Sequence, residues 1–80
     1  MSFYNRDMAA RAKAEYPAGA RIKITDIADG SYPKAIGQAG TVIATDDIGQ
    51  IHCQMDDGTH ATVCAEYGDQ FHKITEEENA

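Results

Sequence analysis

Residues 44–63 read ATDDIGQIHCQMDDGTHATV, in which an aspartate pair followed by glycine occurs twice and a histidine comes after each pair. Aspartate and histidine bind metals in some proteins, and aspartate and glycine make turns in many others. The first interpretation makes this stretch a reactive site, and the second makes it two β-hairpins. Strand register separates the two, because a slip of one residue sends every side chain of a strand to the opposite face.

Both hairpins can be aligned without coordinates. A four-residue loop at 46–49 pairs Thr45 with Gln50, Ala44 with Ile51, Ile43 with His52 and Val42 with Cys53. A three-residue loop at 56–58 pairs Met55 with Thr59, Gln54 with His60, Cys53 with Ala61, His52 with Thr62 and Ile51 with Val63. The two alignments agree on one apolar face, formed by Val42, Ala44, Ile51, Cys53, Met55, Ala61 and Val63.

The turn chemistry needs no metal. A three-residue hairpin loop ends in a left-handed residue, which Gly58 adopts at low cost, and Gly49 suits the same role in the longer loop. Aspartate side chains accept hydrogen bonds from their own turn backbone. We therefore interpret the aspartate pairs as turn residues.

The remaining segments complete a small β-domain. Residues 3–16 lack glycine and proline and predict a short helix with Tyr4, Met8, Ala12 and Tyr16 on one face, ended by Pro17. It would be a lid on the end of a barrel, which we favour, or a docking helix with Phe3 and Tyr4 exposed. Strands are predicted at 20–27, with Ile22 and Ile24 facing the core, and at 40–45, 51–55, 60–63 and 70–74.

These elements predict a mainly β fold, an SH3-like five-stranded small barrel with a short N-terminal α-helix. Its parts are the helical segment 1–17, the barrel 18–75 and an acidic tail, 76–80, expected to be disordered. Such a chain buries only about 60% of its unfolded surface, which leaves little room for a deep catalytic pocket.

The charged residues are distributed unevenly along the chain. The formal net charge is −6, with six Lys or Arg against four acids in residues 1–35 and one lysine against nine acids in residues 36–80. Nucleic-acid binding depends on clustered cations and is disfavoured by this balance. An acidic surface serves solubility, which we favour, or attracts a basic partner.

Motifs for catalysis and cofactors are absent from the sequence. There is no Gly-x-Ser-x-Gly elbow and no phosphate loop, and the carboxylates lack EF-hand spacing. Cys53 faces the core and Cys64 has the opposite parity, so they should not share zinc. His52 and His60 should lie on one outer face, diagonal to each other, as solvent-facing side chains or, less favoured, a shared metal or pH-sensing pair. We expect no enzyme, cofactor or metal, and no membrane segment; the protein should be soluble and cytoplasmic.

The loop 28–38 is a candidate binding surface. The loop 28–38 is long, carries an exposed aromatic beside a rigid proline, and is typical of a binding loop. Alternatively, Tyr32 or Ile36 folds back over an open barrel end. The candidate partner-binding residues are Tyr32, Pro33, Lys34, Asp46, Asp47, His52, Asp56, Asp57, His60 and Tyr67.

The order of the sequence motifs resembles that of a known family. The segments YPAGARIKI, GQAGTV, ATDDIGQIHCQMDDG and DQFHKI, across residues 16–74, are similar to a bacterial and phage family known only as a domain of unknown function. The resemblance implies an SH3-like barrel, often encoded in phages and mobile elements, and implies no activity. The chain departs from the pattern at Met55, where tryptophan is common, and at residues 65–68, where a Pro-Gly turn is usual.

Three functions follow as hypotheses. The first is a small non-enzymatic module that binds a protein through the 28–38 loop and the neighbouring strand face. The second is an acidic inhibitor that occupies the nucleic-acid-binding surface of a host defence enzyme. The third is a direct nucleic-acid binder that uses Arg21, Lys23 and Lys34. The sequence predicts neither the partner nor the oligomeric state.

Overall fold

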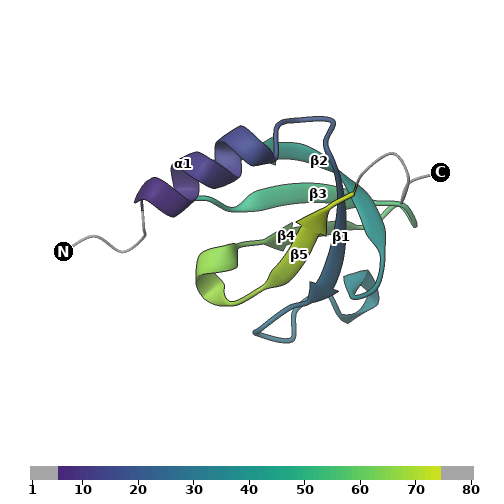
Figure 1. Ribbon diagram of the computed structural model, residues 1–80. Helices are drawn as coiled ribbons and strands as arrows, with labels where there is room; N and C mark the ends of the chain where they lie inside the picture. Colours follow the sequence, from purple (N-terminus) through teal and green to yellow (C-terminus); the bar gives the residue numbers. More distant parts are fainter. Residues whose placement is uncertain (1–5, 75–80) are drawn as a thin grey trace.

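The helix α1 (Arg6–Glu15) leads into a five-stranded sheet in the computed structural model, which describes residues 6–74. The strands are β1 (Arg21–Asp26), β2 (Ala39–Thr45), β3 (Ile51–Met55), β4 (His60–Val63) and β5 (Gln70–Lys73). All neighbours are antiparallel, in the order β4-β3-β2-β1-β5 (Figure 1). Short 3₁₀ helices interrupt two connections, η1 (Pro33–Ala35) and η2 (Ala65–Tyr67). The predicted mainly β, five-stranded fold with one short helix is confirmed.

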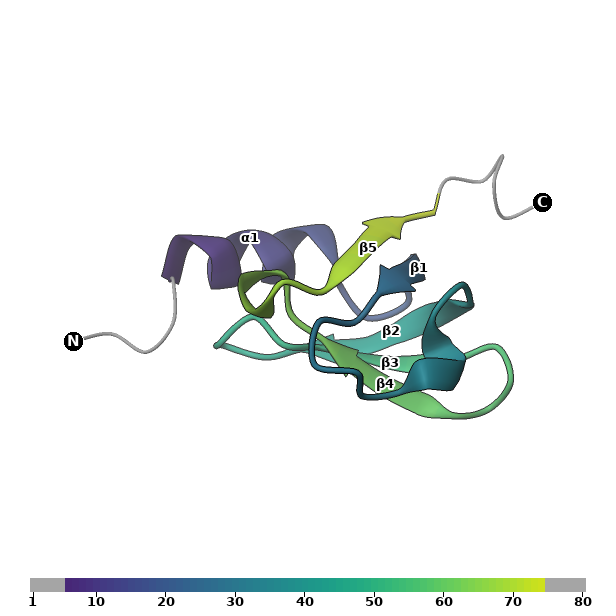
Figure 2. The same ribbon diagram turned by 90° about the horizontal axis from the view of Figure 1, so that it is seen from below.

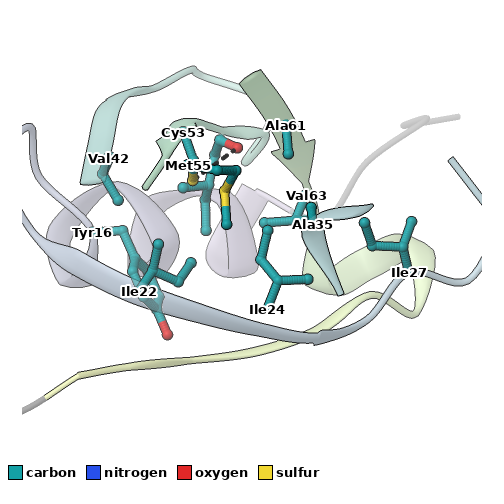
Figure 3. Packing of buried hydrophobic residues seen from close by; sticks show 11 residues of the cluster. Tyr16, Ile22, Ile24, Ile27, Ala35, Val42, Cys53, Met55, Ala61 and Val63 are labelled. Atoms are coloured by element: carbon teal, nitrogen blue, oxygen red, sulfur yellow. Dashed lines mark hydrogen bonds between the residues drawn. The ribbon is translucent and has the colours of Figure 1, made fainter. Parts of the chain in front are cut away.

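The core lies between β1 and the β2–β4 part of the sheet. The sheet curls, so that β1 and β5 form one layer and β2, β3 and β4 the other (Figure 2). Ile22 and Ile24 of β1 are fully buried and point toward Val42, Cys53 and the side chains around them (Figure 3). Burial of these aliphatic groups, at roughly 25 cal/mol per Å² of apolar surface, is the main source of stability in so small a domain.

The predicted register is confirmed in the second hairpin and wrong in part of the first. Cys53 pairs with Ala61 and Val42 with Cys53, as expected. Beyond Val42 a β-bulge intervenes, and Ala44 pairs with His52 instead of Ile51. Ala44 is consequently exposed, and Thr45 takes the inward position at 8% exposure.

The bulge has a physical reason. Thr45 donates its hydroxyl to the carbonyl oxygen of Tyr16 at 2.8 Å, which satisfies a buried polar group just after α1. Strict alternation would have placed this hydroxyl in solvent and Ala44 inside. The extra residue in β2 turns the strand so that Thr45 reaches the helix end.

The helix packs on its own domain, as the lid interpretation predicted. It ends one residue before the buried Tyr16, and its inward residue is Ala9, at 4% exposure. Met8 is 37% exposed, so the predicted face containing it is wrong in that residue. The reason is close contact with the β2–β3 turn, because a Cβ atom on Gly49 would lie only 3.1 Å from the Cα of Ala9. Positions 9 and 49 therefore both need a small residue.

Two of the sequence predictions concern residues that the structure does not describe. Phe3, Tyr4 and the acidic tail lie outside the described residues. Within residues 6–74, no helix is long and apolar enough to cross a membrane.

Candidate functional site

The acidic turns hold themselves together. Asp46 accepts the backbone N–H groups of Ile48 at 3.1 Å and Gln50 at 2.9 Å, and Asp57 accepts the N–H of Thr59 at 3.0 Å. The two turn glycines, Gly49 and Gly58, have φ angles of 86° and 91°. The interpretation of these residues as turn residues is confirmed.

The aspartates of both turns also have side-chain partners within the chain. Arg21 donates two hydrogen bonds to Asp56, at 2.7 and 2.8 Å, and Lys13 contacts Asp47. The hydrogen bonds from Arg21 lower the pKa of Asp56. The pKa of Asp57 falls to about 2, chiefly because the Thr59 hydroxyl donates to it. Asp56 and Asp57 are thus ionised at neutral pH, and all three carboxylates are already engaged within the chain.

The two histidines differ in their surroundings. His52 lies with Nε2 3.0 Å from Asp46 Oδ2 and Nδ1 3.2 Å from Thr62 Oγ1. Partial burial raises the pKa of Asp46, but hydrogen bonds from His52 and the turn backbone outweigh it and lower that pKa overall. His60 is exposed and pairs with Gln54 on β3. Within the described chain, no three His, Cys, Asp or Glu side chains gather as a metal site.

The 28–38 loop is held in a defined shape. Gly37 donates its N–H to the carbonyl of Ile24 at 2.7 Å, and Ile24 donates its own to Gln38 at 3.1 Å. Tyr32 adopts a left-handed conformation, φ 52° and ψ 52°, immediately before η1. Ala35 covers the core at 2% exposure, whereas Tyr32 is 43% and Ile36 41% exposed, so neither of these two side chains folds back to bury itself over the barrel end.

The structure brings Tyr32 and Tyr67 to the same depression. Tyr67 belongs to η2 and is 61% exposed. Both tyrosines line a cavity of about 180 Å³, together with Asp29 and Ser31 of the loop region and Asp69, which follows η2. Gln50 and residues 62–64 complete its lining. We call this the tyrosine groove.

Asp69 sets the geometry of the tyrosine groove. One carboxylate oxygen accepts the N–H of Ala28 at 2.9 Å, and the other accepts the N–H of Cys64 at 2.9 Å. This single side chain therefore ties the start of the 28–38 loop to the end of β4. Sequence reasoning missed Asp69, because its partners lie 41 and 5 residues away along the chain and only the fold makes them neighbours.

The other predicted binding residues do not line the groove. Pro33 and Lys34 are exposed in η1, and the carbonyl of Lys34 accepts the side-chain amide of Gln38. That amide also donates to Asp57 at 3.1 Å, which places Asp57 beside the loop. His52 does not line the groove, but it is hydrogen-bonded to Thr62, which does, and to Asp46, which accepts the N–H of the groove residue Gln50.

A second depression, of about 600 Å³, lies between α1 and β5. Tyr16 and Phe71 meet edge to face in its wall, with ring centroids 5.5 Å apart. Burial raises the pKa of the Tyr16 hydroxyl. Arg11, Glu15 and Asp69 supply charges of both signs around it. Sequence reasoning missed this depression, although a tyrosine ending the helix and a phenylalanine in the last strand were both visible.

Comparison with known proteins identifies a family. Residues 5–74 match the model of a family described as a domain of unknown function, DUF4314. No curated protein and no solved structure matches the chain.

Proposed function

Because the chain belongs to the DUF4314 family, whose description names no activity, we propose from its own geometry that it is a small non-enzymatic protein-binding module. The binding surface is the tyrosine groove, which combines the 28–38 loop with the adjacent end of β4 and η2. The observation that carries the proposal is that two exposed tyrosines, 35 positions apart in sequence, flank one cavity. Tyrosine is among the residues that dominate binding energy in protein interfaces.

The size of the groove favours a peptide side chain over a metabolite. Pockets for small molecules are typically about 300–1,000 Å³, and the tyrosine groove has about 180 Å³. A partner segment would insert one side chain there and run along the surface on either side. The loop needs little ordering on binding because its backbone is already hydrogen-bonded to β1.

The setting of the module is part of the proposal. The order of its motifs supports an origin in phages or mobile elements. Cys53 and Cys64 are both buried free thiols, which supports a reducing cytoplasm as its compartment.

The two alternative functions have less support. An acidic inhibitor would present the turn aspartates to a basic surface, but all four already have partners within the chain. A nucleic-acid binder would use Arg21, which is engaged with Asp56 and Thr41. The tyrosine groove, by contrast, presents aromatic side chains that are substantially exposed.

The test compares the immobilised full chain with a Tyr32→Ala/Tyr67→Ala double variant. Both are incubated with lysate of the source cells, with and without nuclease treatment, and retained proteins are quantified by mass spectrometry. We expect proteins retained by the natural chain to be lost from the double variant. Ile43→Ala is the matched control, since Ile43 is a 47% exposed apolar side chain outside the groove.

Two results would contradict the proposal. Retention unaffected by the double substitution would remove the groove from the interaction. Retention that disappears on nuclease treatment would favour the nucleic-acid alternative instead.

A further inference from the structure

The tyrosine groove has a one-sided charge. Asp29 and Asp69 border it, and none of its nine lining residues, all in the described part of the chain, is Lys, Arg or His. The depression between α1 and β5 differs, because Arg11 there offsets its carboxylates. The tyrosine groove therefore favours a cation over an anion or a neutral group.

Both carboxylates are fixed before any ligand arrives. Asp29 accepts the N–H of Ser31 at 2.9 Å, and this hydrogen bonding lowers the pKa of Asp29, so it is ionised at neutral pH. Asp69 is fixed by Ala28 and Cys64. An ionised carboxylate has about four lone-pair sites, so one backbone bond per oxygen leaves acceptor capacity on Asp69.

The aromatic walls favour the same chemistry. A guanidinium or ammonium group is attracted to the face of a tyrosine ring within about 6 Å, and the attraction grows when the site is partly desolvated. Tyr32 and Tyr67, both lining the cavity, supply two such rings. Arginine fits better than lysine, because its planar fork stacks on rings and donates to carboxylates at once.

We propose that the tyrosine groove binds an arginine side chain of an extended partner segment, with the guanidinium between Tyr32 and Tyr67 and facing Asp29 and Asp69. This inference rests on the proposed function, since it names the chemistry of the partner at the same site. The net charge of −6 would draw such a basic segment toward the domain.

The experiment is a selection from a random peptide library displayed on particles, against the immobilised full chain. Particles retained by the natural chain but not by Tyr32→Ala/Tyr67→Ala are sequenced. We expect the selected peptides to share an arginine. Groove-dependent peptides without arginine would overturn the inference and leave the proposed function standing. Failure to select any groove-dependent peptide would overturn both.

Titrations of the protein with peptide variants then measure how much the arginine charge contributes to binding. One selected peptide is compared with the same peptide carrying citrulline, a neutral isostere of arginine, and with its lysine version, by following backbone amide shifts. We expect citrulline to weaken binding about tenfold or more, and salt to weaken the arginine peptide. Equal binding by the citrulline or lysine peptide would overturn the choice of arginine.

Protein variants locate the guanidinium. Asp29→Asn keeps an oxygen for the Ser31 N–H but removes the charge, so it should weaken the arginine peptide and not the citrulline peptide. Asp47→Asn, the charge-matched control outside the groove, should leave both unchanged. Tyr67→Phe should retain binding that Tyr67→Ala loses. An Asp29→Asn variant that binds the arginine peptide as tightly as the natural chain would contradict the assigned contact.

Discussion

Asp69 accepts the backbone N–H of Cys64 at 2.9 Å and thereby fixes the turn that carries Tyr67 against the end of β4. Its second oxygen holds the N–H of Ala28, at the start of the loop that carries Tyr32. The two walls of the tyrosine groove thus depend on one carboxylate.

Asp69→Asn should destabilise the fold and loosen the groove together. An amide has only one acceptor oxygen, so one of the two backbone N–H groups loses its partner and the NH₂ group faces another donor. Leaving a partly buried donor unsatisfied costs about 1–3 kcal/mol. The free energy of unfolding in urea should fall by up to this amount, since the Cys64 N–H is partly buried and the Ala28 N–H is exposed, and amide exchange at Ala28 or Cys64 should accelerate. Glu66→Gln removes the same charge in the same connection and should change neither quantity.

Gly49→Ala should displace α1. Gly49 has a φ of 86°, which an alanine adopts at a cost of about 1–2 kcal/mol, and the new Cβ would press on Ala9 at 3.1 Å. Gly58→Ala is the matched control, because its φ is 91° and nothing lies within 4 Å of the added Cβ. We expect Gly49→Ala to lower the free energy of unfolding more than Gly58→Ala, with faster amide exchange in α1. Equal losses would mean that the helix does not depend on this contact.

The alternation of apolar and polar residues predicted the second hairpin correctly, because both of its strands follow it. The side chains of β3 and β4 alternate strictly, and a three-residue loop fixes their register. The first hairpin could not be fully predicted, since Thr45 and Ala44 exchange places through a bulge. What favours the bulge is the carbonyl of Tyr16, 29 residues earlier, and strand periodicity contains no information about it.

The sequence identified the two tyrosines of the tyrosine groove but did not predict that they come together. Tyr32 and Tyr67 stand out as aromatics in connecting segments, but their convergence depends on a tertiary link. His52 and His60 are diagonal across β3 and β4, as predicted, but strand pairing did not predict that His52 is hydrogen-bonded to Asp46 as well as to Thr62. The turn that supplies Asp46 curls back toward β3, and no pairing rule for regular strands includes that contact.

Acid should destabilise the protein in part through Asp57. Its pKa lies at about 2 in the folded state, below the ordinary value of 3.8, because Thr59 donates to the ionised form. A carboxylate with a lowered folded-state pKa stabilises the fold fully above its unfolded pKa, and this contribution disappears as the pH falls toward about 2. Asp57→Asn should therefore flatten the fall in the free energy of unfolding between about pH 4 and pH 2. Thr59→Val, which removes the hydroxyl donor, should flatten it as well; an unchanged slope in both variants would contradict this assignment.

Cys53 should resist thiol reagents until the protein unfolds. The residue is 1% exposed, and burial raises the pKa of its thiol to about 11, so both access and the thiolate form are lacking near pH 8. In a Cys64→Ala variant, which leaves one thiol, iodoacetamide should modify Cys53 at a rate that rises with urea in step with unfolding. The same variant in full denaturant gives the reference rate of an open thiol. Modification of the native variant at that reference rate would show that β3 does not present Cys53 to the core, and the register shared by both hairpins would be wrong.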